Sequence, residues 1–138
     1  MQLADTSAWT NLSKDEDVAS DFEGLVEAGE IATCDMVKLE LLWSARDHEG
    51  FTFARRRLDD LVLCPIEAAV WKRAIAVQEL LAARGPLHHR QVPIPDLLIA
   101  AAAEAAGMPV CHYDAHFELI AEATGQAMRA IAPLGSLE

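Results

Sequence analysis

The chain has 138 residues, enough for one domain, and 52% of them are hydrophobic, enough for a buried core. Its 22 acidic residues against 11 Lys and Arg give a net charge of −11, the reverse of what phosphate contacts alone would need in a nucleic-acid-binding protein. The acids then either bind a cation or face a basic peptide. The sequence contains no apolar run of about 18 residues and no signal-peptide pattern at its start. This predicts a cytoplasmic protein without a membrane partner.

The first half of the sequence predicts short apolar strands that alternate with helices. Residues 1–5 (MQLAD) and 31–34 (IATC) are expected to be strands, and apolar residues at helical spacing predict a helix over 15–28 that Gly29 stops. Asp35 is expected to cap a helix over 36–46, and another helix follows over 51–61. Residues 61–64 (LVLC) predict a third strand, which Pro65 ends.

The second half continues the alternation. Residues 67–83 predict a long helix and residues 87–93 a loop, after which Pro93 and Pro95 mark the start of an alanine-rich helix that Gly107 ends. A fourth strand is expected over 109–114, a short helix over 116–125 and an edge strand over 127–132. This pattern predicts an α/β fold: one domain over residues 1–138, with a central parallel sheet of four to five short strands flanked by helices.

Four carboxylates are expected to meet at one edge of that sheet. Asp5 ends the first predicted strand and Asp114 the fourth, and ligands bind at the C-terminal edge of parallel strands. Asp96 opens the alanine-rich helix, and Glu40 lies on an apolar helix face. Each has a simpler alternative, as a helix cap, a partner of a helix dipole or a residue at the rim of a helix. Together they predict a hard-cation site with oxygen ligands.

Cysteine and tryptophan positions give expectations about the core. The three cysteines are odd in number and widely spaced, so we expect them to be free and buried; they are Cys34, Cys64 and Cys111. Trp71 is expected in the core. Trp9 and Trp43 are also expected there, with a groove for a partner helix as the alternative.

Four stretches in this order resemble PIN-domain ribonucleases, in particular the VapC toxins of bacterial toxin–antitoxin pairs. They are ADTSAW at 4–9, a glutamate in the helix after the second strand, PDLLIAAAAEAAG at 95–107 and HYDAHFELIA at 112–121. The resemblance implies an endoribonuclease that depends on Mg²⁺, with Mn²⁺ as a substitute. It also implies four catalytic acids, which are Asp5, Glu40, Asp96 and Asp114.

The roles of these acids follow from the same resemblance. Asp5, Asp96 and Asp114 would bind the metal, and Glu40 would orient or activate a water molecule. Auxiliary hydroxyl groups would come from Thr6 or Ser7.

One position departs from the resemblance. Relatives often carry a second acid two residues after the last motif aspartate, where this chain has His116. We expect His116 to be a rim residue, with donation to a phosphate as the alternative. His89 and Arg90, in the loop before Asp96, are possible RNA contacts, whereas the arginines at 55–57 are expected to form a solvated helix face.

The resemblance implies three partners: an RNA substrate (transfer or ribosomal RNA), a VapB-like antitoxin and a second copy of the chain. A phospho-receiver domain would also gather acids around Mg²⁺, but here the third strand ends in Cys64 and Pro65 and offers no acceptor aspartate. The remaining alternative is a non-catalytic PIN-like binding module, its metal site weakened by His116.

Overall fold

A five-stranded parallel sheet forms the centre of the protein, as predicted. The computed structural model describes residues 1–137, and its strands lie in the order β3-β2-β1-β4-β5. Leu3 of β1 is in register with Ala32 of β2 on one side and with Val110 of β4 on the other. The strand bounds are β1 Gln2–Ala4, β2 Ile31–Thr33, β3 Val62–Leu63, β4 Val110–His112 and β5 Met128–Ala130. The edge position expected for the last strand is confirmed.

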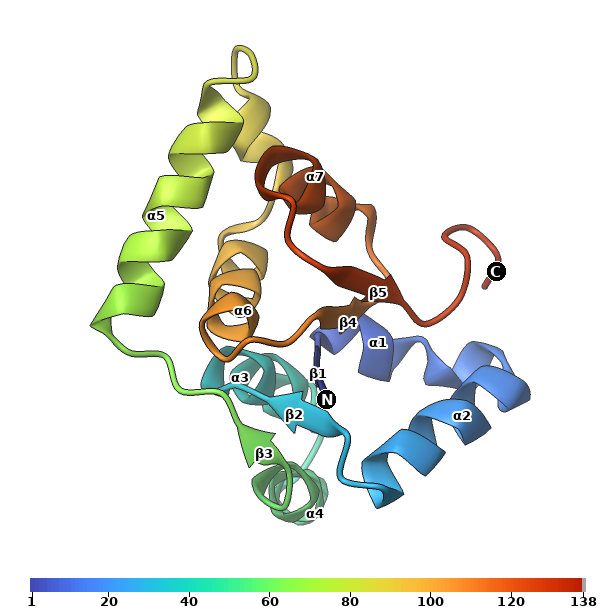
Figure 1. The fold of residues 1–138 in the computed structure, drawn as a ribbon. Helices are drawn as coiled ribbons and strands as arrows, with labels where there is room; N and C mark the ends of the chain where they lie inside the picture. The colour runs from blue at the N-terminus through green and yellow to red at the C-terminus, as the bar shows by residue number, and fades with distance from the viewer. Residues whose placement is uncertain (138) are drawn as a thin grey trace.

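Helices cover both faces of the sheet. Figure 1 shows α1 and α2 on one side of the strands and α5, α6 and α7 on the other. The α-helices are α1 Thr6–Thr10, α2 Glu16–Glu27, α3 Asp35–Trp43, α4 His48–Asp59, α5 Ala68–Ala82, α6 Ile94–Ala105 and α7 Ala115–Thr124. Two short 3₁₀ helices, η1 Leu12–Lys14 and η2 His88–Gln91, lie between them, and η2 occupies the segment that was expected to be a loop.

Alternate residues of β1 enter the two halves of the core. Leu3 packs with the apolar residues of α3, α5, α6 and α7, whereas Ala4 packs with Ala8 and Phe22 on the α1–α2 side. Helix α6 is buried from Asp96 to Ala103 because its run of alanines allows neighbouring elements to pack closely. Gly107, at a φ of +72°, follows this helix in the left-handed conformation that glycine adopts most readily.

The helices after β2 differ from the prediction at their ends. Helix α3 stops at Trp43, where the Ser44 hydroxyl donates to the carbonyl of Leu41, and Asp35 is its first residue while Cys34 occupies the cap position. The chain then takes an extended conformation at Asp47, whose side chain accepts a hydrogen bond from the backbone N–H of Gly50. This capping starts α4 earlier than predicted.

The cysteine expectation is confirmed, but two of the tryptophan expectations are wrong. Cys34, Cys64 and Cys111 are free and buried. Trp9 is partly buried and stacks edge-to-face on Phe22, with the ring centroids 4.8 Å apart. Trp43 and Trp71 were expected in the core, yet they are 88% and 53% exposed. Both lie on helix faces that no element within residues 1–137 covers. In the described part of the chain, no helix has the length and apolar character needed to cross a membrane.

Candidate metal centre

Two neighbouring strands bring the first pair of acids to one edge of the sheet. Asp5 follows β1 and Asp114 follows the region of β4, and these strands pair in parallel. Each aspartate also caps a helix: Asp5 accepts from the N–H of Ser7, and Asp114 accepts from the N–H of His116. The helix-cap alternative is therefore confirmed for both aspartates, while their role as metal ligands stays a prediction.

Asp5 is the most buried of the four acids. The residue is only 3% exposed, and this burial raises the pKa of its carboxyl group. Oδ2 accepts the hydrogen bond from Ser7 at 2.9 Å, whereas Oδ1 is buried without a hydrogen-bond partner. A buried oxygen in this state costs about 1–3 kcal/mol. A bound cation would satisfy it.

Asp96 lies in the first turn of α6, and the other acids act on it. Its pKa is raised to about 7, chiefly by burial and then by the negative charges of Asp5 and Asp114, while His116 opposes the shift. Glu40 adds to it as well. Asp5, Asp114 and Glu40, which belong to elements distant in sequence, are therefore near enough to Asp96 for their charges to act on its carboxyl group.

Hydroxyl groups connect the acids to the strand ends. Thr6 donates a hydrogen bond to Glu40 Oε1 at 2.9 Å, which fixes the glutamate of α3 beside the start of α1. Burial raises the pKa of Glu40 as well, with the charge of Asp5 adding to the effect. The Ser7 hydroxyl accepts from the backbone N–H of Tyr113, just before Asp114, at 2.9 Å. Both residues expected to provide auxiliary hydroxyls therefore hold the arrangement of the acids.

His116 lies between two of the carboxylates, and its side chain is 37% exposed, as the expected rim position implies. Its Nδ1 is 2.9 Å from Asp114 Oδ1 and 3.2 Å from Asp96 Oδ2. Within residues 1–137, these three residues form the one group of three His, Cys, Asp or Glu side chains whose ligand atoms all lie within 4.8 Å of one another. The donor set of carboxylate oxygens and an imidazole nitrogen suits a divalent cation.

Sequence reasoning missed His112, which positions the last acid. His112 is fully buried in β4, and its Nδ1 accepts from the backbone N–H of Asp114 at 3.1 Å. Burial lowers the pKa of His112, which keeps the ring neutral and Nδ1 free to accept. On the other side of the ring, Nε2 lies 3.3 Å from Glu118. The spacing His112-x-Asp114 was the available signal.

The two basic segments, residues 55–57 of α4 and Arg90 of η2, both lie on the surface. Arg57 forms an ion pair with Glu23 and lies 5.5 Å above the ring of Trp9, and Arg55 pairs with Asp59. All three arginines at 55–57 are exposed, as expected for a solvated helix face, and two of them have partners within the chain. Arg90 is exposed as well, in η2 directly before α6.

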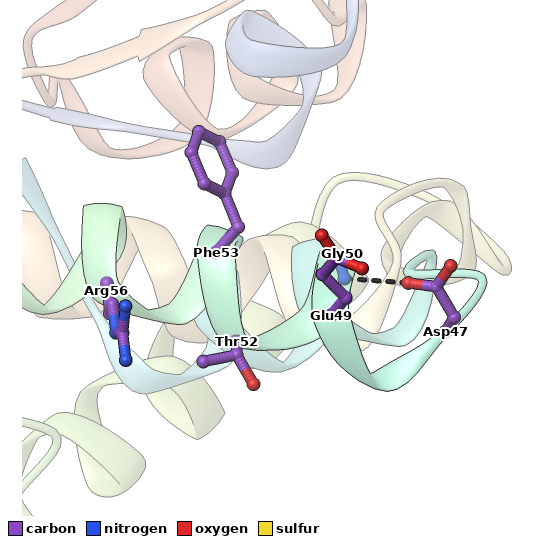
Figure 2. Close-up of a pocket in the computed structure, with 6 residues that line it drawn as sticks. All are labelled: Asp47, Glu49, Gly50, Thr52, Phe53 and Arg56. Carbon is purple, nitrogen blue, oxygen red and sulfur yellow. Dashed lines mark hydrogen bonds between the residues drawn. The ribbon is translucent and has the colours of Figure 1, made fainter.

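One sizeable hollow has no residue of the acidic cluster in its lining. Its volume is about 780 Å³, and it surrounds the start of α4, lined by Asp47, Glu49, Gly50, Thr52, Phe53 and Arg56. Figure 2 shows that Phe53 and Thr52 point to different sides of this helix, while Asp47 faces Gly50 as a cap. These side chains do not converge on one point. We therefore assign the candidate site to the acidic cluster instead.

Comparisons with known proteins show the family to which the chain belongs. The PIN domain family model matches residues 3–123. Ribonuclease VapC18 of Mycobacterium tuberculosis is 42% identical over 133 residues, which cover 96% of this chain and 96% of that protein. Ribonuclease VapC51 of the same organism is 41% identical over 136 residues, covering 99% and 96%.

Solved structures share the fold at lower identity. A chain in the crystal structure of DNA-bound VapBC from Salmonella typhimurium has a TM-score of 0.70 at 16% identity and covers 96% of this chain and 100% of that chain. A chain of VapBC2 from Rickettsia felis, bound to a promoter DNA fragment, has a TM-score of 0.68 at 16% identity and covers 94% and 97%. The match of the family model and the curated relatives lead to one conclusion: the chain belongs to the PIN-domain family and, within it, to the VapC ribonucleases.

Proposed function

We propose that this chain is a Mg²⁺- or Mn²⁺-dependent endoribonuclease that acts as the toxin of a toxin–antitoxin pair. The observation that carries the proposal is the cluster of four acids, three of which have pKa values raised by burial: Asp5, Glu40 and Asp96. Such a cluster is costly without a cation, and family membership makes RNA the substrate of choice.

Each residue of the site has a proposed task. Asp5, Asp96 and Asp114 hold the divalent ion, which when bound polarises the phosphodiester as a Lewis acid. Glu40, held by its hydrogen bond from Thr6, orients the attacking water and accepts its proton. His89 and Arg90 contact phosphates of the RNA beside α6 and offset the negative charge of the protein.

The test is cleavage of RNA by the purified chain with and without divalent ions. We expect internal cleavage with Mg²⁺ or Mn²⁺ and none in excess EDTA, because the carboxylates alone repel the phosphodiester. Undiminished cleavage in EDTA would contradict metal dependence. Binding of RNA without cleavage, with either ion present, would instead support the non-catalytic module. We propose the cytoplasm as the site of action because the substrate is cellular RNA.

A groove beside Glu40 suits the antitoxin. It has a volume of about 480 Å³ and is lined by Thr6, Met36, Leu39, Glu40 and Trp43. Its apolar wall ends at the acidic cluster, so a partner helix with an apolar face and a basic side chain would match both parts. We propose that a VapB-like antitoxin binds here.

Replacing Trp43 by alanine tests this groove. Trp43 is 88% exposed in the free protein, so the fold should tolerate its loss, whereas a buried tryptophan at an interface contributes about 2 kcal/mol or more. We expect the Kd for the cognate antitoxin, measured by calorimetry, to rise about 30-fold or more. Leu39→Ala should weaken binding less, and Leu80→Ala, an exposed leucine of α5 outside the groove, should leave the Kd unchanged. A Trp43→Ala protein with unchanged affinity would place the antitoxin elsewhere.

The homodimer stays a prediction, for which the chain offers a surface. Trp71 and Ile75 of α5 and Ile94 of α6 are exposed and line an apolar hollow of about 290 Å³. An exposed apolar patch of this kind is typical of protein–protein contacts. We propose it as the surface on which a second copy of the chain docks.

A further inference from the structure

The nitrogen of His116 is held in place by its own backbone and by the cap of α7. The backbone N–H of His116 donates to Asp114 Oδ1 at 3.0 Å, and the ring folds back so that Nδ1 lies 2.9 Å from the same oxygen. The opposite neighbour is Asp96 Oδ2, at 3.2 Å. Two carboxylates from different helices therefore face one imidazole nitrogen.

These short distances are not hydrogen bonds. Nδ1 is buried and has no partner with acceptable hydrogen-bond geometry, although two carboxylate oxygens are near it. If a proton on Nδ1 held the acids together, at least one contact should point along the N–H direction. The arrangement instead resembles three ligand atoms around a common centre, with Nδ1 offering a lone pair.

An independent observation indicates that a cation belongs at this cluster. Asp5 is only 3% exposed, and its Oδ1 has no hydrogen-bond partner. The charge of Asp5 raises the pKa of Asp96, and the charge of Asp114 raises the pKa of Asp5. The unsatisfied oxygen thus belongs to the same cluster as the nitrogen of His116.

We propose that His116 is a direct metal ligand through Nδ1, together with Asp96 and Asp114, and that it makes the site prefer Mn²⁺ and similar transition ions over Mg²⁺. The inference rests on the proposed function and assigns a ligand and an ion preference to the same site. Imidazole nitrogen favours transition ions, whereas Mg²⁺ selects oxygen ligands and retains water. The second acid that relatives often carry here would give the opposite preference.

A spectroscopic test reads the ligand directly. Mn²⁺ is added to the full-length protein, and electron spin echo modulation is recorded, because a directly bound imidazole gives a ¹⁴N coupling that carboxylates cannot give. We expect ¹⁴N modulation in the wild type and in His48→Ala, which removes an exposed histidine of α4. The signal should disappear in His116→Asp, which keeps a ligand at the position but replaces nitrogen by oxygen.

Affinity measurements test the ion preference. Calorimetry gives the Kd for Mg²⁺ and the Kd for Mn²⁺. We expect the first divided by the second to exceed one in the wild type and to fall by about 10-fold or more in His116→Asp. His116→Asp should still bind Mn²⁺, since it retains a carboxylate set, and this shows that the variant remains folded. An unchanged ratio would overturn the preference.

The outcomes separate this proposal from the proposed function. Bound Mn²⁺ without ¹⁴N modulation in the wild type, or modulation that persists in His116→Asp, would remove His116 from the ligand set and leave the nuclease assignment intact. Failure of the wild type to bind either ion would overturn both.

Discussion

Asp96→Asn is expected to lower the rate of RNA cleavage by about 100-fold or more without unfolding the protein. Loss of a carboxylate that holds the ion removes several kcal/mol of stabilisation from the transition state, and about 3 kcal/mol corresponds to a factor of about 100. The amide has the shape of the carboxylate and fits the first turn of α6. Initial rates on a fluorescent RNA at saturating Mn²⁺, together with circular dichroism of each variant, provide the measurement.

Asp47→Asn is the matched control for this experiment. It makes the same chemical change in the hollow at the start of α4, where Asp47 caps this helix through Gly50, and asparagine caps a helix as well as aspartate. We expect its cleavage rate to equal that of the wild type. Asp5→Asn should behave like Asp96→Asn. Equal activity in all of these proteins would remove the acidic cluster from the mechanism.

Asp96→Asn should also stabilise the metal-free protein. The Asp96 carboxyl has a pKa of about 7 in the folded state against an ordinary value of 3.8, chiefly because it is buried. Ionising it at about pH 8 therefore costs folding free energy, which asparagine avoids. In EDTA, we expect Asp96→Asn to raise the free energy of unfolding by about 1–3 kcal/mol, measured by urea denaturation. A destabilised variant would contradict this account of the cluster.

The sign of the pH dependence follows from the same pKa. Between 3.8 and about 7 the folded protein holds a proton on Asp96 that the unfolded chain has released. The unfolding free energy of the metal-free wild type should therefore fall as the pH rises through this range and level off above it. Asp5 and Glu40, whose pKa values are also raised, act in the same direction.

Two comparisons test this origin of the slope. Asp96→Asn should show a shallower fall of unfolding free energy with pH, whereas Asp47→Asn should retain the slope of the wild type. Saturating Mn²⁺ at about pH 8 should make the wild type more stable than Asp96→Asn, because the ion binds the folded wild type and not the unfolded chain. A slope that does not change in Asp96→Asn would show that other groups cause it.

The strand and site pattern could be predicted because it depends on local signals. Apolar strands followed within two residues by Asp5 and Asp114 imply that both acids lie at one edge, since the ends of parallel strands meet there. Pro95 indicated the start of a helix, so Asp96 was expected in its first turn. Each inference needed only a few neighbouring residues.

The rest depended on tertiary contacts that no local pattern encodes. The contact of His116 with Asp96 arises from the packing of α6 against α7, and the support that His112 gives Asp114 arises from its burial in β4. Trp43 and Trp71 were expected inside because composition does not distinguish burial within a chain from burial against a partner. The exposed positions are where we propose other molecules bind.

The order of the strands in the sheet also determines when the acidic cluster can form during synthesis. The hydrogen bond between Ser7 and Tyr113 joins the two strand ends that carry Asp5 and Asp114, and these partners are 106 positions apart in the sequence. During translation the early segment is made long before the late one, so a growing chain cannot complete the proposed metal centre until the region around Tyr113 has been added and has packed beside the end of β1.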